Sequence, residues 1–237
     1  MLVQLKSLLK KLPLPLSRNH RYDLLTKKII QQYCNETFNC IDVGSHRGEV
    51  LDWFLKFAPK GKHYAFEPVP VLFDALQKKY SHKNCSICNI ALSDVKGLSS
   101  FNYVTSNPAY SGLKKRNYDR KKETEIIIQV QTDSLDKVVP SDLPVHFIKI
   151  DVEGGDMNVL RGATRILSNS HPLMIFEFGI GGSDIYGTTP EELFSFLESF
   201  QYRIFLLSYF IQQRSSLGLD DFRKQFYSKA NYYFVAS

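Results

Sequence analysis

The sequence has no run of 18 or more apolar residues, so no membrane-spanning helix is predicted. It also lacks an internal repeat and a low-complexity tract, which excludes a repeat array. No G-x-G-x-x-G motif occurs, which disfavours a dinucleotide phosphate clamp. The composition is that of an ordinary soluble globular protein, 43% hydrophobic and 23% charged, and 237 residues suit one domain with a sizeable core.

Cysteine is scarce: the four are Cys34, Cys40, Cys85 and Cys88. Cys85 and Cys88 have the spacing of a metal-binding pair, but they fall in an expected strand, where positions three apart point to opposite faces. No second pair completes a zinc site. We expect four reduced thiols in a cytoplasmic protein, with Cys40 in the core.

The net charge of +6 lies in the first 33 residues, which hold seven Lys and Arg against Asp23 alone. Residues 34–237 hold 23 basic and 23 acidic residues, so the body of the protein is neutral. A neutral body argues against a broad nucleic-acid footprint, and no nucleic-acid partner is predicted.

An N-terminal arm, residues 1–35, precedes the main body at 36–237. Met1–Leu12 is Leu-rich, but its apolar core is too short for a signal peptide, and Pro13 and Pro15 end any helix. Two readings stay open: an amphipathic segment in peripheral contact with an anionic membrane, or a docking or homo-oligomer arm, which is favoured. Arg21–Tyr33 has a better helical pattern and is expected to lie beside the ligand site as a lid.

The rest of the chain is organised around residues 40–49. Asn39–Val43 predicts a short buried strand, Gly44–Gly48 a tight glycine loop, and Glu49–Phe57 a helix with an apolar stripe. A strand, a glycine turn and a helix N-terminus together form the unit that holds nucleotide-like ligands. Because His46 stands where a middle glycine would lie, the loop suits a smaller and less anionic ligand than a dinucleotide. An ordinary strand-to-helix turn is the alternative.

A second apolar strand ends at Glu67 and Pro68, 25 residues after Asp42. In doubly wound folds an acid at about this distance holds ribose hydroxyls, and that role is favoured here over a solvated strand-end acid. A third strand is expected over Cys85–Ser93, and its end should lie beside the first two strand ends, where an adenine ring can stack.

Leu98–Thr105 and Thr124–Thr132 look strand-like and predict a small antiparallel insertion in the α/β pattern. The variable loop 105–125 lies between them and carries six basic residues at 106–122. Long loops of this kind are more often functional lids than accidents. A solvated loop is the alternative for most of its charges, but Tyr110 and Ser111 are expected to face an acceptor, and the basic residues suit an anionic one.

The second strong stretch is Val145–Asp156, an apolar strand that runs into Asp151, Glu153 and two glycines. The ligand crevice of an open parallel sheet lies at the carboxyl ends of its central strands, so both acids are expected at the site. Lys149 lies on the same strand face as Asp151 and is expected to pair with it, because an unpaired lysine inside a central strand is costly. Asp156 is expected to cap the next helix.

The same design recurs at Pro172–Gly179, where a buried strand ends at Glu177. Thr189 is expected to cap a helix that runs to Phe200. Two last strands are expected at Tyr202–Tyr209 and Tyr232–Ala236.

The sequence resembles the FkbM-type S-adenosylmethionine-dependent methyltransferases over roughly residues 22–207. Four motifs carry the resemblance: Ile-Asp-Val-Gly-Ser-His-Arg-Gly-Glu at 41–49, Ala-Phe-Glu-Pro at 65–68, Asn-Ile-Ala-Leu-Ser-Asp at 89–94, and Lys-Ile-Asp-Val-Glu-Gly-Gly-Asp at 149–156 with Leu-Arg-Gly-Ala at 160–163. The last motif is the most specific, although Asp156 stands where the family often has a glutamate.

The resemblance implies a Rossmann-like α/β fold with a mostly parallel sheet of seven strands in the class I methyltransferase order 3-2-1-4-5-7-6, the last strands antiparallel. It also implies S-adenosyl-L-methionine as cofactor and O-methylation of a hydroxyl on a sugar, a glycan or a secondary metabolite. A nicotinamide-dependent oxidoreductase and a non-catalytic nucleotide-binding protein of the same fold are the alternatives.

Three groups of site residues follow from these motifs. Those expected to contact the cofactor are Asp42, Gly44, Ser45, His46, Gly48, Glu49, Glu67, Pro68, Asn89, Ile90, Ala91 and Asp151. Those expected to act in catalysis are Glu153 as general base, Asp151 as its orienter, and Lys149, with Asp151 and His46 as the other candidates for the base. Those expected to contact the acceptor are Tyr110, Ser111 and Glu177. No metal is predicted, since no ligand spacing demands one; a divalent ion stays open as the alternative because several carboxylates converge.

Overall fold

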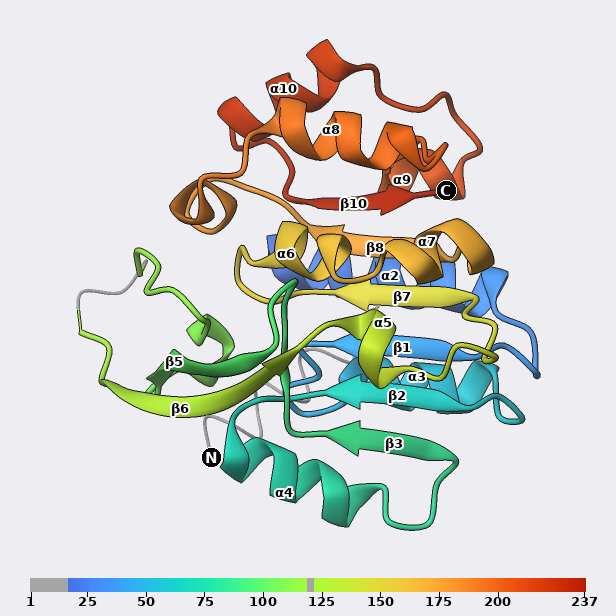
Figure 1. Ribbon diagram of the computed structural model, residues 1–237. Coiled ribbons are helices and arrows are strands. Elements are labelled where there is room, and N and C mark those ends of the chain that lie inside the picture. The colour runs from blue at the N-terminus through green and yellow to red at the C-terminus, as the bar shows by residue number, and fades with distance from the viewer. Residues whose placement is uncertain (1–16, 119–121) are drawn as a thin grey trace.

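The computed structural model describes residues 17–118 and 122–237, and a seven-stranded sheet forms its centre (Figure 1). The strands of this sheet are β1 Cys40–Val43, β2 His63–Phe66, β3 Cys85–Cys88, β7 Phe147–Ile150, β8 Leu173–Glu177, β9 Ile204–Leu206 and β10 Tyr233–Ala236. Their spatial order is β3-β2-β1-β7-β8-β10-β9, which is 3-2-1-4-5-7-6 when they are numbered within the sheet. β10 is antiparallel to both β8 and β9, so the sheet is mixed and β10 alone runs against the rest.

Helices cover both faces of this sheet. On one face lie α2 Arg18–Tyr33, α3 Glu49–Phe57 and α9 Leu207–Ile211; on the other lie α5 Leu135–Val138, α6 Asp156–Arg161, α7 Thr164–Ser170, α8 Pro190–Ser199 and α10 Leu219–Tyr227. α4 Pro70–Lys79 packs near α3 beside β2. Figure 1 shows α5, α6 and α7 in front of the sheet and α2 and α3 behind it. The strands are apolar on both sides because both sides are buried.

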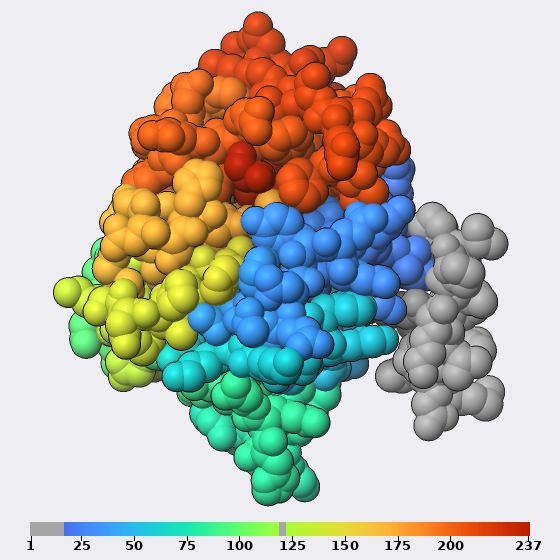
Figure 2. All heavy atoms as spheres, turned by 90° about the vertical axis from the view of Figure 1, so that its right-hand side faces the viewer, coloured from blue at the N-terminus to red at the C-terminus, as the bar shows by residue number. Residues whose placement is uncertain are grey.

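The parallel strands begin on one side of the molecule, with their amino ends together, and their carboxyl ends lie on the opposite side. Figure 2 shows the side of the amino ends, where the last turns of α2, including Ile29 and Tyr33, lie near Phe205, Phe210 and Ser237. The contact is between α2 and α9. α2 therefore packs against α3 and α9, two helices that are far apart in the sequence.

A second sheet contains β4 Ala91–Leu92, β5 Gly97–Val104 and β6 Glu125–Asp133 in the order β4-β6-β5. β5 and β6 are antiparallel, which confirms the predicted insertion, whereas β4 is parallel to β6. The single strand expected at Cys85–Ser93 was wrong, because β3 and β4 belong to different sheets. Between them the Asn89 amide donates to the carbonyl oxygens of Glu67 and Pro68, at 2.8 and 3.0 Å, and the chain turns there.

The helix ends differ from the expected ones in two places. α2 begins at Arg18 rather than Arg21, since the Ser17 hydroxyl accepts the His20 amide hydrogen as an N-cap. The cap expected at Asp156 was wrong: Gly155 precedes the helix and Asp156 is its first residue. Asp156 is fully buried and accepts the Glu177 amide hydrogen at 3.3 Å, so it joins the helix to β8 instead of capping it.

The C-terminal third holds the other corrections. The strand expected at Tyr202–Tyr209 stops at Leu206 and α9 follows, because a short apolar run does not by itself separate strand from helix. α10 was not expected at all. The cap at Thr189 is confirmed, as its hydroxyl accepts the Glu192 amide hydrogen.

Within residues 17–118 and 122–237, no helix combines the length and apolarity needed to cross a membrane. The predictions made for Met1–Leu12 lie outside the residues that the structure describes.

Candidate active site

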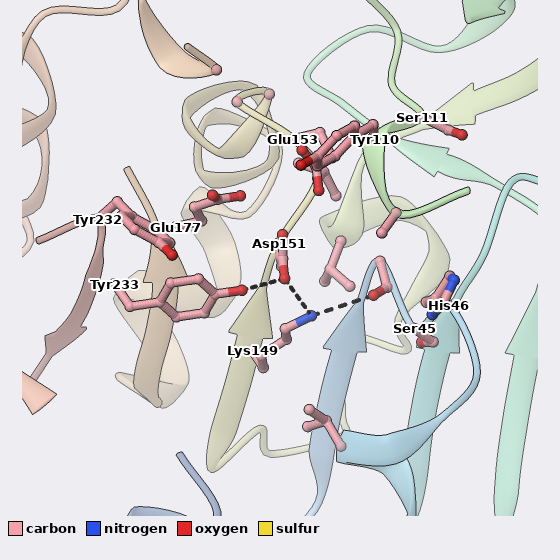
Figure 3. Close-up of a pocket in the computed structure, with 18 of the residues that line it drawn as sticks. Ser45, His46, Tyr110, Ser111, Lys149, Asp151, Glu153, Glu177, Tyr232 and Tyr233 are labelled. Atoms are coloured by element: carbon pink, nitrogen blue, oxygen red, sulfur yellow. Dashed lines mark hydrogen bonds and ion pairs between the residues drawn. The ribbon is translucent and has the colours of Figure 1, made fainter. Parts of the chain in front are cut away.

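A cavity of about 520 Å³ opens at the carboxyl ends of β1, β2, β7 and β8 (Figure 3). All but two of the residues predicted to contact cofactor or acceptor, or to act in catalysis, line it. The exceptions are Gly48, which is the N-cap of α3 and packs against Tyr80, and Asn89, which holds the turn after β2. α2 also borders the cavity, as predicted, through residues that include Arg18 and Tyr22.

The glycine loop lies tightly between β2 and β7. The amides of Gly44 and Ser45 both donate to the Phe66 carbonyl oxygen, at 3.1 and 3.0 Å. Gly44 has a φ of +77°, and a Cβ there would lie 1.9 Å from the Asp151 carbonyl oxygen. Only glycine fits this position, because the Asp151 backbone occupies the space that a side chain would need.

Glu67 closes the loop from the end of β2. Its side chain is 4% exposed, and its two oxygens accept the amide hydrogens of His46 and Val69 at 2.8 and 2.9 Å. Burial raises the pKa of the Glu67 carboxyl to about 7. His46 is held in the left-handed region, with φ of 47°, and burial lowers the pKa of its imidazole. Both groups therefore titrate near or below neutral pH.

Lys149 lies at the centre of the cavity floor and is nearly buried. Its Nζ is 3.3 Å from Asp151 Oδ2 and 3.8 Å from Asp42 Oδ1, and it donates to the Gly44 carbonyl oxygen at 3.3 Å (Figure 3). Burial opposes the lysine charge, but the two carboxylates outweigh it and raise the pKa of Lys149. The predicted pairing of Lys149 with Asp151 is confirmed.

The register of the sheet places three polar groups in one row. Lys149 pairs with Ile175, so Asp151 and Glu177 lie two residues further along their strands, and Glu177 pairs with Tyr233. Because alternate residues of a strand share a face, the three side chains meet. The Tyr233 hydroxyl donates to Asp151 Oδ2.

The neighbours in this row shift the pKa values of its two acids, Glu177 and Asp151, in opposite directions. Burial and the charge of Asp151 raise the pKa of Glu177 well above its usual value. For Asp151, the charge of Lys149 and the hydrogen bonds from Tyr233 and Glu177 outweigh burial and lower the pKa. Of these two acids, Glu177 therefore holds a proton more tightly and Asp151 favours the ionised form.

Glu153 lies above this row and pairs with Arg116 from the variable loop. Both side chains are mostly buried, with 16% and 17% exposure. Glu153 also has a left-handed backbone, with φ of 58°. Such a conformation is uncommon for a residue other than glycine and is often found at functional sites.

Asp151, Glu153 and Glu177 form the one acidic cluster in the described part of the chain whose oxygens could share a cation. Their ligand oxygens all lie within 4.8 Å of one another. Lys149 and Arg116 already pair with two of the three, so these cations and the Glu177 proton balance the charge.

Sequence reasoning missed a wall of aromatic residues. Tyr22 stacks on Tyr233 at 5.0 Å and meets Tyr232 edge-on at 4.8 Å, and all three line the cavity. Tyr232 and Tyr233 could have been predicted. An antiparallel last strand begins where the parallel strands end, so residues at its start lie beside the site. Of the two loop residues predicted for the acceptor, Tyr110 lines the cavity beside Arg116, whereas the Ser111 hydroxyl accepts the Val104 amide hydrogen and points away from the acids in Figure 3.

The comparisons with known proteins agree with this geometry. The Methyltransferase FkbM domain matches residues 42–204, and the chain therefore belongs to this family of methyltransferases. Methyltransferase sdnD of Sordaria araneosa is 28% identical over 178 residues, which are 57% of this chain and 66% of sdnD. The chain thus spans just under two thirds of that relative.

The crystal structure of methyltransferase FkbM from Methylobacillus flagellatus has a TM-score of 0.54 at 15% identity and covers 86% of this chain. This chain spans 44% of that one. The likeness shows an α/β, class I methyltransferase-like fold with a mostly parallel sheet.

Proposed function

We propose that this protein is an S-adenosylmethionine-dependent methyltransferase that methylates a hydroxyl of a sugar, a glycan or a secondary metabolite. One observation carries the proposal. The glycine loop, the Glu67 carboxyl and the Lys149–Asp151–Glu153 strand end share a single cavity, in a chain of a methyltransferase family.

The cavity residues fit the cofactor. Gly44 brings bare backbone to the crevice, and Glu67 stands at the end of β2 with lone pairs left for a ribose diol. Asp42 is 1% exposed and lines the cavity 3.8 Å from Lys149 Nζ, and its carboxylate can also accept hydrogens from the ammonium group of the cofactor. Ile90 and Ala91 line the same side and offer apolar surface for an adenine.

When bound, S-adenosylmethionine supplies a methyl group activated by a sulfonium. An acceptor hydroxyl must still be held in line and lose its proton, and a positioned base contributes ~10²–10⁴-fold to such a step. Asp151 is a poor base because Lys149, Tyr233 and Glu177 all stabilise its charge. Among the described residues, Glu153 pairs with Arg116 alone, so it is the better candidate.

The test is Glu153→Gln, which keeps the shape of the side chain and removes its basicity. We expect unchanged S-adenosylmethionine affinity by calorimetry and a rate of S-adenosylhomocysteine formation that falls ~10²–10⁴-fold at saturating acceptor. An unchanged kcat would rule out Glu153 as the base. Binding of NAD in place of S-adenosylmethionine would overturn the function itself.

The acceptor is proposed to be a small molecule or glycan and not a nucleic acid, because residues 34–237 carry no net charge. Turnover on RNA, with none on glycosides or hydroxylated metabolites, would refute this part.

A further inference from the structure

Arg116 is the one basic residue in the described part of the variable loop that lines the cavity. Its guanidinium pairs with Glu153 and lies 5.1 Å from the centre of the Tyr110 ring. The two lysines before it point elsewhere: Lys114 packs over Tyr186, and Lys115 pairs with Glu125 outside the cavity.

The charges around Arg116 are balanced. Glu153 pairs with it, and the other acids near Glu153 are Asp151, which faces Lys149, and Glu177, whose side chain hydrogen-bonds to Asp151. An anionic acceptor would therefore meet a guanidinium whose charge is already compensated, contrary to the suggestion of the basic loop sequence. The Arg116–Glu153 pair has no net charge, with hydrogen-bond donors on Arg116 and acceptors on Glu153. A neutral ligand with hydroxyl groups suits this pair, because a hydroxyl can both donate and accept.

Arg116 also has an incomplete set of hydrogen bonds. Its Nε is buried and has no hydrogen-bond partner among the described residues. A buried donor without a partner is unfavourable, so the present arrangement favours a ligand that brings an oxygen to the guanidinium. Because a guanidinium presents its donors in a planar fork, it can serve Glu153 and one ligand oxygen at once.

We propose that Arg116 is a specificity residue for the acceptor, and that it binds an oxygen of a neutral ring bearing adjacent hydroxyls while holding Glu153 ready for the hydroxyl that is methylated. This rests on the proposed methyltransferase function and narrows its acceptor class to neutral vicinal diols, as in uncharged sugars. Arg116 acts on the chemistry through the position and charge of Glu153.

Four titratable or charged groups lie around Glu153: Arg116 from the loop, Asp151 after β7, Glu177 from β8, and the Tyr186 hydroxyl, which flanks Gly112 together with Glu153. Arg116 is the cation among them. Its removal therefore makes Glu153 easier to protonate, and the acid limb of the kcat/KM profile moves to higher pH.

The experiment measures S-adenosylhomocysteine formation with a panel of neutral methyl glycosides and, for contrast, methyl glucuronide. Arg116→Met removes both the fork and the charge, Arg116→Lys keeps the charge alone, and Lys115→Met is the matched control because Lys115 lies outside the cavity. S-adenosylmethionine affinity reports that each variant is folded.

We expect Arg116→Met to raise the KM of the preferred neutral glycoside by about 10- to 100-fold and to move the acid limb upward. Arg116→Lys should restore the position of the limb but not the KM, since an ammonium has no planar fork. Lys115→Met should change neither.

The proposal is overturned if Arg116→Met leaves both acceptor KM and acid limb unchanged, if it weakens cofactor binding as much as acceptor binding, or if the glucuronide is preferred. Failure of the wild type to turn over any acceptor while binding S-adenosylmethionine would refute the proposed function, and this inference with it. The first three outcomes leave the methyltransferase assignment intact.

Discussion

Glu67→Gln converts one oxygen of the proposed ribose site into an amide nitrogen at nearly constant size. In the wild type the two oxygens accept the amide hydrogens of His46 and Val69. A carboxylate has about four acceptor positions, so two remain for ribose hydroxyls. Gln keeps one oxygen that can accept a backbone amide hydrogen, whereas Ala would leave the amides of His46 and Val69 both without this partner.

The magnitude follows from the lost contact. A hydrogen bond to a charged group contributes about 1.5–3 kcal/mol, so the dissociation constant for S-adenosylmethionine should rise by about 10- to 100-fold at pH 8. Ribose hydroxyls favour the ionised carboxylate. Because burial raises the pKa of Glu67 to about 7, the affinity of the wild type should weaken as the pH falls below that value. The variant should lack this dependence.

The same shift affects stability, and its sign is fixed. Folded Glu67 binds its proton more tightly than the unfolded chain, whose pKa is near 4.5. Its contribution to the free energy of unfolding is therefore fully present below about pH 4.5 and is lost as the pH rises through about 7, by about 3 kcal/mol at most. Glu67→Gln should flatten this part of the pH dependence in urea denaturation.

Isothermal calorimetry between pH 6 and 8.5 measures the binding part of the prediction. Glu36→Gln is the matched control, because that carboxylate is exposed and pairs with Lys60 at the surface. If Glu67→Gln binds S-adenosylmethionine as tightly as the control at pH 8, Glu67 does not hold the ribose.

Two further predictions concern the cavity floor. Lys149→Met should lower the free energy of unfolding at pH 8 by about 3–5 kcal/mol, since Asp42 and Asp151 lose their buried partner; equal stability of variant and wild type in urea would contradict the pairing. Removal of divalent cations with EDTA should leave turnover unchanged, because Lys149 and Arg116 already balance the acidic cluster; an activity lost in EDTA and restored by Mg²⁺ would show that the cluster binds metal.

Much of the site could be predicted because its polar residues follow buried strands. Asp42, Glu67, Asp151 and Glu177 each stand in or directly after an apolar strand, and parallel strands bring their carboxyl ends to one edge. The order of the strands in the sheet could be predicted as well, but only from the resemblance to a known family. Lys149 was informative for a different reason, since a lysine in a central strand needs a partner within reach.

The missed residues depend on elements whose place the local pattern does not define. Arg116 lies in a loop whose path depends on the Asn102–Gly112 bridge and on the hydrogen bond of the Lys114 amide to Tyr186, 72 residues further along the chain. Asp156 has the sequence context of a helix cap, yet its carboxylate is buried against the end of β8. Propensity describes the isolated helix, and here the packing of α6 on the sheet overrides it.

Two residues other than glycine have a left-handed backbone conformation in the loops of the candidate site. His46 follows β1 with φ of 47°, and Glu153 follows β7 with φ of 58°. Left-handed residues other than glycine cost of order 1–3 kcal/mol, and glycine would occupy either position with less strain. Gly44 and Gly154, which neighbour these loops, show that glycine is used where the chain needs space alone, since a Cβ at either would overlap backbone atoms. His46 and Glu153 thus each place a side chain at the same cavity from a backbone conformation that glycine would adopt with less strain.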